Sequence, residues 1–321
     1  GESGSTLRFL IPIALALTGN VIFRGHGRLM QRPQTPYFEL FRNKGIDYRL
    51  EGDLLTVQGA LTPGRYALRG DISSQFITGL LYALPLLHGD SDIVLTTQLE
   101  SESYVNLSLD ALRQFGIVIE PAAHGWHIPG NQSYQPHDCA VEADYSQSGF
   151  FYAAQGIGNP IAVTGMNPHS VQGDRIVVDY MDRLNTLGTV DLDVRDCPDL
   201  VPPLALRAAL RAGETTVISG AARLRLKESD RLASVTAVLG AMGAEIDEGS
   251  DRLTIHGVSS LRGGAAVDSW GDHRIAMMAA MAATVCQSPI TLTGAESVRK
   301  SYPGFWDDYC RLGGCIQEVS L

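Results

Sequence analysis

One pattern of residues recurs five times along the chain, and this internal repeat constrains the fold more than any other feature of the sequence. Each copy has a small or polar cluster, then an apolar helical segment, a polar turn and a short strand. The five copies read GESGSTLRFLIPIALALTGNVIFRG, GDISSQFITGLLYALPLLHGDSDIVLTT, ADYSQSGFFYAAQGIGNPIAVTG, DCPDLVPPLALRAALRAGETTVISG and WGDHRIAMMAAMAATVCQSPITLTG. The helical segments are apolar almost all round, which predicts buried helices.

A second, more amphipathic helix is expected after each of these strands, followed by a glycine and one or two further strands. In the fourth copy the inward stripe of that helix is Leu232, Val235, Leu239 and Met242. The glycines expected just beyond these helices are Gly45, Gly116, Gly188, Gly243 and Gly313. Each unit is therefore predicted to be β-α-β-α-β-β.

The third unit is shorter than the others. The buried helices are expected near Phe9, Phe76, Phe150, Leu204 and Ile275, and only the third interval, about 54 residues, falls well below the others. The hairpin expected after Gly188 is reduced to TVDLDV. Either this unit is naturally short, or residues are missing between Gly188 and Thr189.

Length and composition indicate a two-domain α/β protein. The chain has 321 residues, 45% of them hydrophobic and 19% charged, with 34 glycines. We expect a first, incomplete domain over residues 1–142, with two of three repeat units, and a second domain over residues 143–321. Because Gly1 begins in the middle of a motif, we expect residues to precede it in the complete protein.

The charge and the cysteines exclude several classes of function. A net charge of −10 disfavours nucleic acid as a partner, and no apolar run reaches the length of a membrane span. Five scattered cysteines without a C-x-x-C pair indicate neither a disulfide framework nor a zinc site. They favour a reducing cytoplasm.

Small and polar residues open the first two buried helices, where free N–H groups favour anions. The first opening contains Gly4, Ser5 and Arg8, and the second contains Ser73, Ser74 and Gln75. Arg32 lies in the loop after the first strand. Simple helix capping and a solvated loop arginine are the alternative interpretations, although one cap does not explain the whole triplet at residues 73–75.

Charged clusters open the later helices. Lys227-Glu228-Ser229-Asp230-Arg231 is predicted to begin a helix on which Lys227 and Arg231 share a face. The run Gly271-Asp272-His273-Arg274 precedes an almost wholly apolar helix, where charges must be paired or bind a ligand. Asp199 occupies the analogous place in the fourth unit, where a simple N-cap is the alternative interpretation. With Lys300 after the last strand, these groups predict a site for small anions that bear phosphate. No metal-ligand spacing or nucleotide-binding motif occurs, so we expect no cofactor and no metal.

Taken together, these motifs resemble those of the 5-enolpyruvylshikimate-3-phosphate synthase family (3-phosphoshikimate 1-carboxyvinyltransferases). The motifs that carry the resemblance are GESGSTLR, Arg32-Pro33, SSQF, SESY, DCPD, LKESDRL, GDHR and KSYP, in the family's order over the whole chain. The resemblance implies two domains of three β-α-β-α-β-β units each, in an inside-out α/β barrel arrangement with buried helices, that close on a site between them. Five of these six units are found here.

The resemblance also implies a reaction and a role for each residue. The family transfers the enolpyruvyl group of phosphoenolpyruvate to the 5-hydroxyl of shikimate 3-phosphate, releases phosphate and needs no cofactor; it serves aromatic amino acid biosynthesis and is the target of glyphosate. Residues matching the shikimate 3-phosphate contacts are Ser73, Ser74, Ser101, Tyr104 and Lys227. Residues matching the phosphoenolpyruvate contacts are Gln75, Arg32, Arg231, Arg274 and Lys300, with Gly4 and Ser5 nearby. Asp199 would take the 5-hydroxyl proton and Glu228 the proton at the methylene carbon, with Lys300 also part of the catalytic group.

Three departures from the family and two alternatives belong to this interpretation. The family's N-terminal unit, with a Lys-Ser pair and an Arg, has no counterpart; Arg223 replaces an asparagine of some members; and the third hairpin is short. One alternative is a catalytically impaired, anion-binding fragment. The other is the related transferase acting on UDP-N-acetylglucosamine, but the loop RGHGRLMQRP lacks the cysteine usual in those enzymes. We expect a cytoplasmic monomer that binds no nucleic acid or membrane.

Overall fold

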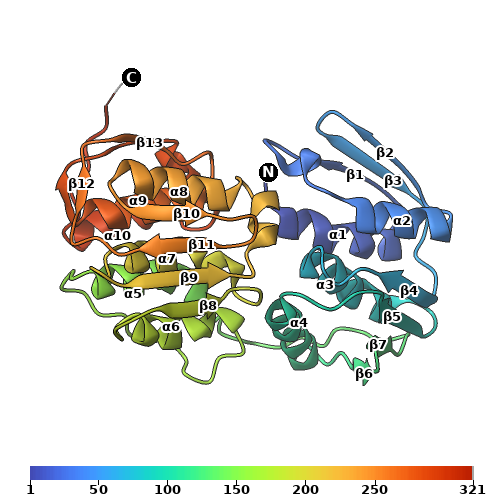
Figure 1. Ribbon diagram of the computed structural model, residues 1–321. Coiled ribbons are helices and arrows are strands. Elements are labelled where there is room, and N and C mark those ends of the chain that lie inside the picture. Colours follow the sequence, from blue (N-terminus) through green and yellow to red (C-terminus); the bar gives the residue numbers. More distant parts are fainter. Residues whose placement is uncertain (320–321) are drawn as a thin grey trace. The chain divides into compact units, whose positions relative to one another are not determined.

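The structure is a computed structural model that describes residues 1–319 (Figure 1). It divides into two compact units, with the boundary between Val141 and Glu142. Among the residues described, no helix combines the length and the apolar character needed to cross a membrane. The units are described separately below.

Unit 1, Gly1–Val141, contains two helix–strand repeats. Its α-helices are α1 Gly4–Leu17, α2 Thr35–Lys44, α3 Ser74–Ala83 and α4 Glu102–Gln114, with short 3-10 helices at η1 Leu29–Gln31 and η2 Leu84–Leu86. Its strands are β1 Asn20–Arg24, β2 Asp47–Glu51, β3 Leu54–Gln58, β4 Gly64–Leu68, β5 Ser91–Leu95, β6 Glu120–Ala122 and β7 Gly125–Ile128.

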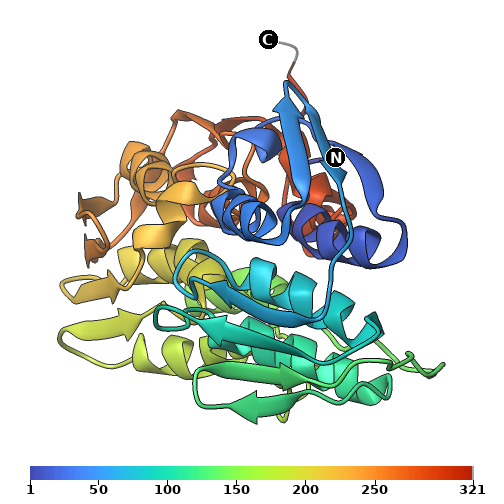
Figure 2. The ribbon, with the colours of Figure 1, turned by 90° about the vertical axis from the view of Figure 1, so that its right-hand side faces the viewer.

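Helices α1 and α3 pack against each other at the centre of unit 1, and α3 lies directly below α1 in both views (Figures 1 and 2). The strands form two sheets, β1-β3-β2, which is antiparallel, and β4-β5-β7-β6, in which only β4 and β5 are parallel. Helix α1 begins at Gly4 and helix α3 at Ser74, so their first turns carry the small polar clusters of the first two repeats.

Unit 2 begins at Glu142 and holds the remaining repeats. Its α-helices are α5 Tyr145–Gly156, α6 Val177–Arg183, α7 Val201–Ala209, α8 Arg231–Ala241, α9 His273–Ala283 and α10 Phe305–Arg311, with 3-10 helices at η3 Gly173–Ile176, η4 Pro198–Leu200, η5 Ala222–Leu226 and η6 Ala295–Lys300. Its strands are β8 Val190–Asp193, β9 Thr215–Ser219, β10 Glu245–Glu248, β11 Leu253–His256, β12 Leu261–Gly263, β13 Ala266–Asp268, β14 Cys286–Ser288 and β15 Thr291–Thr293.

The repeat is visible in the sheets. The sheet of β8, β9, β11 and β10 has the same strand order and strand directions as that of β4, β5, β7 and β6 in unit 1, with a helix after each of the first two strands. The β-α-β-α-β-β prediction is thus confirmed for the second and fourth repeats. In the fifth repeat, β12 and β13 precede α9 in the sequence and pair in parallel with β14 and β15, which follow it, so the predicted order β-α-β-α-β-β is not found there.

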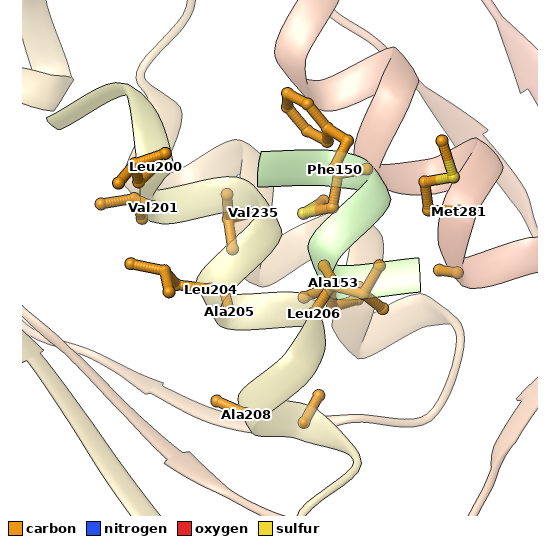
Figure 3. Packing of buried hydrophobic residues seen from close by; sticks show 14 of the residues in the cluster. Phe150, Ala153, Leu200, Val201, Leu204, Ala205, Leu206, Ala208, Val235 and Met281 are labelled. Atoms are coloured by element: carbon orange, nitrogen blue, oxygen red, sulfur yellow. The ribbon is translucent and has the colours of Figure 1, made fainter. Parts of the chain in front are cut away.

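Apolar helices form the core of unit 2 (Figure 3). Phe150 and Ala153 of α5 pack with Leu204 and Ala205 of α7 and with Met281 of α9. Every residue from His273 to Ala282 is buried, so α9 is enclosed on all sides as its sequence predicts. Burying this much apolar surface is the main favourable term in folding.

Some predictions about the elements are wrong. No strand forms over residues 160–164, although one was expected there. In the second and fourth repeats the equivalent strand is paired with a hairpin, whereas here the short connection after Gly188 enters β8 directly, and β8 pairs with β9. Without its hairpin the segment has no ladder of hydrogen bonds to join.

The other two corrections concern a helix face and a glycine. Helix α1 was expected to be buried all round, yet Leu10 and Leu17 are 45% and 68% exposed because no described element covers that face. Gly188 was expected just after a helix, but α6 already ends at Arg183, and Gly188 belongs to the following turn. Its φ of 84° still favours glycine there.

Replacing Leu204 with Ala is expected to reduce the free energy of unfolding by about 2–5 kcal/mol, because it leaves a cavity in the core of unit 2. Denaturant unfolding measures this change. The matched control is Leu187→Ala, whose side chain is 88% exposed and should change stability by less than about 0.5 kcal/mol. Equal effects of the two substitutions would contradict the packing described here.

Candidate functional site

In unit 1 the first turns of α1 and α3 are joined by side-chain hydrogen bonds. The Gln75 amide group donates to Ser5 Oγ over 2.8 Å, and Arg8 Nη1 donates to Gln75 Oε1, also over 2.8 Å. Arg8 is 4% exposed, and its guanidinium lies 4.6 Å from the centre of the Phe76 ring. Two residues predicted from sequence, Ser5 and Gln75, are therefore in direct contact.

Arg8 also reaches the loop that carries Arg32. Its Nη2 donates to the carbonyl of Pro33 over 3.0 Å, and its Nε lies 3.5 Å from Gln34 Oε1. The Arg32 guanidinium lies over Gly4, where a Cβ would come within 2.8 Å of Nη1. Arg32 is thus brought to the first turn of α1, into the space beside Gly4, although a flexible guanidinium at that place is able to shift away.

The serines at the start of α3 differ in their roles. Ser73 caps the helix, and its Oγ accepts from the backbone N–H of Gln75 at 3.4 Å. Ser74 is buried, with 5% exposure. One serine is thus explained by capping, as the simpler interpretation expected, and the other residues of the triplet are not.

Ser101 and Tyr104 lie at the start of α4, which packs against α3 through a hydrogen bond between Thr78 Oγ1 and Ser108 Oγ. Ser101 is buried and has a φ of 55°, the left-handed region that is unfavourable for a residue with a Cβ. Such strained positions cluster at functional sites. Ser101 and Tyr104 are therefore placed in the same unit as the Gln75 group, on a neighbouring helix.

In unit 2 three cations converge on Asp199, which lies in η4 just before α7. Its Oδ1 accepts from Arg231 Nη1 at 2.7 Å and lies 3.4 Å from Lys227 Nζ. Its Oδ2 accepts from Arg274 Nη2 at 2.9 Å. Segments from three different repeat junctions therefore meet at one carboxylate.

Arg231 connects this carboxylate with two others. Its Nε donates to Asp272 Oδ2 over 2.9 Å, and its Nη2 donates to Glu228 Oε2 over 2.8 Å. Arg231 and Asp272 are 1% and 0% exposed. Asp272 also accepts from Ser229 Oγ and caps α9 through the N–H of Arg274. A buried charge pair of this kind persists only with such additional hydrogen bonds.

The sequence predicted that Lys227 and Arg231 share one face of a helix. The two side chains do lie close together, but not for that reason. Helix α8 begins only at Arg231, because Asp230 is its N-cap and accepts from the N–H of Ala233. Lys227 precedes the helix in an extended conformation. The two cations meet because both bind Asp199 Oδ1, not because they share a helix face.

Burial and charge act in opposite directions on Asp199. Burial alone would raise the pKa of its carboxyl, but the charges of Arg274, Lys227 and Arg231 outweigh burial and hold the pKa well below its ordinary value. Burial lowers the pKa of Lys227, an effect that Asp199 only partly offsets. Burial and the charge of Arg274 lower the pKa of His273 to about 4, so this ring is neutral at pH 7.

Lys300 lies beside this group at the end of η6. Its Nζ donates to the carbonyl of Gly271 over 2.7 Å, at the turn before α9. The preceding residue, Trp270, has a φ of 49°, a second strained position next to predicted site residues. Lys300 itself is exposed.

The arrangement in unit 2 is suited to binding anions and moving protons. Three guanidinium or ammonium groups surround a carboxylate, and guanidinium forks bind carboxylates and phosphates in two-point fashion. Glu228 supplies a second carboxylate close by, with 23% of its side chain exposed. In the part of the chain that is described, no cluster of His, Cys, Asp or Glu could hold a metal ion.

Several structural residues were not predicted as part of the site. Asp272 was recognised from sequence as a charge in need of a partner, but not as the partner of Arg231. Arg8 was noted only as part of the first polar cluster, and Gln34 was not singled out at all. An arginine on the apolar segment RFLIPIAL was the available signal for Arg8; nothing local indicated Gln34.

Comparisons with known proteins agree with these motifs. Residues 1–309 match the family described as EPSP synthase (3-phosphoshikimate 1-carboxyvinyltransferase). The chain is 46% identical to the 3-phosphoshikimate 1-carboxyvinyltransferase of Clostridium kluyveri and 43% identical to that of Clostridioides difficile, covering 100% of this chain and 79% and 77% of those proteins. An EPSP synthase structure from Acinetobacter baumannii matches with a TM-score of 0.76 at 25% identity, over 99% of this chain and 79% of that one. The fold also resembles the enolpyruvyl transferase NikO of Streptomyces tendae, with a TM-score of 0.73 at 18% identity over 97% of this chain and 77% of that one.

The low pKa of Asp199 predicts a pH-dependent contribution to stability. Because the folded pKa lies below the unfolded value of about 3.9, the ionised carboxylate stabilises the fold above that pH, and the contribution is lost as the pH falls through the folded pKa. Asp199→Asn should therefore cost about 1–3 kcal/mol at pH 7 and progressively less below about pH 4.

Urea unfolding from pH 2.5 to pH 7 measures the difference. Asp191→Asn, at an exposed position in β8, is the control and should change stability by less than about 0.5 kcal/mol throughout. A pH-independent cost of Asp199→Asn would show that the carboxylate is not held ionised by its neighbours.

Proposed function

Since the chain belongs to the EPSP synthase (3-phosphoshikimate 1-carboxyvinyltransferase) family, we propose that it transfers the enolpyruvyl group of phosphoenolpyruvate to the 5-hydroxyl of shikimate 3-phosphate and releases phosphate. The observation that carries this proposal is the convergence of Arg231, Arg274 and Lys227 on Asp199. Two substrates that both bear phosphate need several cations, and the acceptor hydroxyl needs a base.

The groups of unit 1 are proposed to bind the less reactive parts of the substrates. Ser73, Ser74, Ser101 and Tyr104 offer hydroxyls for shikimate 3-phosphate. Gln75 and Arg32 offer an amide and a guanidinium for phosphoenolpyruvate, where Gly4 lets a ligand approach the backbone. Ser5 supports Gln75 by accepting its amide hydrogen.

The groups of unit 2 are proposed to act on the reacting atoms. Arg231, Arg274 and Lys300 bind phosphoenolpyruvate, and Lys227 binds shikimate 3-phosphate. Without substrate, Asp199 is a weak base because three cations hold its pKa low. Anionic substrates that draw these cations away raise its pKa, so Asp199 becomes able to take the 5-hydroxyl proton when the substrates are bound.

Glu228 is proposed to serve the other proton transfer. As the 5-oxygen attacks carbon 2 of phosphoenolpyruvate, the methylene carbon gains a proton and becomes a methyl group in a tetrahedral intermediate. Loss of a proton from that methyl group and of phosphate from carbon 2 then gives the enol ether. Glu228 lies three residues from Arg231 and is ion-paired with it, which keeps its carboxylate next to the anion-binding cations.

A second candidate is supported by one observation. The chain covers 79% and 77% of the two curated relatives described above, so part of their length has no counterpart in this chain. The chain would then bind the two anions with reduced or no turnover. Phosphate release by the chain alone, compared with the chain extended by the N-terminal segment of a relative, distinguishes the two candidates.

Other aspects of the proposal concern the setting of the reaction. We expect a monomer that works in the cytoplasm without a cofactor and binds neither nucleic acid nor membrane. The acidic net charge of −10 supports the expectation that no nucleic acid binds. The five cysteines, scattered without a C-x-x-C pair, support the expectation of a reducing cytoplasm.

Replacing Asp199 or Glu228 with Ala is expected to lower the rate of phosphate release by about 10²–10⁴-fold, while binding of shikimate 3-phosphate changes far less. Rates come from a phosphate-release assay with both substrates, and affinities from calorimetry. The controls are Asp191→Ala and Glu245→Ala, which remove exposed carboxylates elsewhere in unit 2. Loss of binding equal to the loss of rate would contradict the proton-transfer roles, and absence of both turnover and binding in the extended chain would contradict the proposed function.

A further inference from the structure

The hydroxyl of Tyr37 lies where α1 and α3 cross. Its Oη is 2.7 Å from the carbonyl oxygen of Arg8 in α1 and 3.0 Å from that of Phe76 in α3. One hydroxyl proton is thus shared between two backbone acceptors, one on each helix. Tyr37 itself belongs to α2, so a third helix joins the first two at this point.

The sequence of α1 explains why Arg8 has a carbonyl to offer. In an α-helix this oxygen accepts from the N–H four residues later, but that residue is Pro12, which has no N–H. The Tyr37 hydroxyl supplies the missing donor from outside the helix. A proline within a helix otherwise leaves a buried acceptor unsatisfied, which costs about 1–3 kcal/mol.

The sequence of α3 provides the space for this hydroxyl. A Cβ on Gly79 would lie 2.3 Å from Tyr37 Oη, 2.4 Å from the Arg8 carbonyl oxygen and 3.0 Å from Pro12 Cγ. Gly79 is helical and needs no special φ, so its glycine is explained by space alone. Pro12, Tyr37 and Gly79 are therefore mutually dependent.

The surroundings keep Tyr37 fixed and protonated. The side chain is 1% exposed, and its ring meets Phe76 edge-on at 4.8 Å and stacks on Phe41 at 5.8 Å between centres. Burial raises the pKa of Tyr37 well above its ordinary value, although the charge of Arg8 opposes the shift. The hydroxyl is therefore protonated and able to donate at pH 7.

We propose that Tyr37 is a positioning residue that sets the spacing between the first turns of α1 and α3, and through it the orientation of Gln75. The Tyr37 hydroxyl bonds the carbonyls of Arg8 and Phe76. Arg8 also donates to the amide oxygen of Gln75, and Phe76 is the next residue after Gln75 in the chain. The Gln75–Ser5 bond spans the same two helices. This inference rests on the proposed function in so far as Gln75 binds phosphoenolpyruvate.

The test compares Tyr37→Phe with Tyr66→Phe. Tyr66 is also 1% exposed, lies in the same unit, and donates to the Thr62 carbonyl at 2.5 Å, but it touches neither helix carbonyl. Tyr37→Phe removes a buried hydroxyl that bonds two carbonyls and Tyr66→Phe removes a part-buried hydroxyl that bonds one, so both variants should lower the urea midpoint. Only Tyr37→Phe should raise the KM for phosphoenolpyruvate, by about tenfold with kcat changed less, whereas Tyr66→Phe stays within about twofold.

A rescue variant separates positioning from simple loss of stability. Pro12→Ala restores an N–H that can bond the Arg8 carbonyl within α1 but does not restore the link to Phe76 in α3, so Pro12→Ala/Tyr37→Phe should recover much of the lost stability while the KM for phosphoenolpyruvate stays raised. The double variant also carries the test if Tyr37→Phe does not fold. Unchanged KM in Tyr37→Phe, or equal losses in Tyr37→Phe and Tyr66→Phe, would overturn the proposal, and so would a double variant in which the KM returns to that of the unmodified chain.

A ligand-free measurement keeps this proposal distinct from the proposed function. The side-chain amide of Gln75, followed by NMR, should change its chemical shift in Tyr37→Phe and not in Tyr66→Phe, because its bond to Ser5 is altered. If the unmodified chain neither binds nor turns over the substrates, the proposed function fails while this signal still decides the role of Tyr37. An unchanged Gln75 signal in Tyr37→Phe would contradict positioning.

Discussion

The guanidinium of Arg231 is the group on which the polar part of unit 2 depends. It is almost wholly buried and bonds the carboxylates of Asp199, Glu228 and Asp272. A buried carboxylate without a partner is strongly unfavourable, so these segments are stable together and not separately. Because the three carboxylates come from the turns before α7, α8 and α9, one side chain ties together the ends of three helices that are otherwise apolar.

The two units use the same repeat for different chemistry. In unit 2 the helix beginnings are joined by ion pairs around Asp199, whereas in unit 1 the first turns of α1 and α3 are joined through neutral amide and hydroxyl groups with Arg8. In the second and fourth repeats, which share the β-α-β-α-β-β order, the first turns of the buried helices α3 and α7 follow equivalent strands. What differs is which residues face each other there: ion-paired side chains in unit 2 and mostly neutral side chains in unit 1.

Much of this could be predicted from the sequence, because the signals are local or periodic. The apolar segments, their polar beginnings and the glycines at 45, 116, 243 and 313 indicated the helices and the places where polar side chains meet. The strand expected over residues 160–164 fails because a strand needs a partner, and local sequence does not record that its hairpin is absent. The start of α8 was misplaced because Asp230 caps the helix more effectively than the charged run before it.

Contacts between distant residues were beyond the reach of local patterns. The pairing of Arg231 with Asp272, and the bond from Tyr37 to a carbonyl left without its helical donor by Pro12, join segments whose proximity exists only in the folded units. Gly79 illustrates the difficulty: in the sequence it is a glycine within a helix, and only the crossing of α1 and α3 explains it. A polar residue within an apolar segment of the sequence, such as Arg8, was the best indication of such contacts.

The central claim is that the cations around Asp199 are shared between that carboxylate and anionic substrates. The pKa of the Asp199 carboxyl, measured by ¹³C NMR with and without shikimate 3-phosphate and phosphoenolpyruvate, tests it most directly. The account predicts a pKa well below the ordinary value in the free protein and a clear rise when the substrates bind. A pKa that stays equally low in the presence of saturating substrates would contradict the account, because the cations would then belong to Asp199 alone.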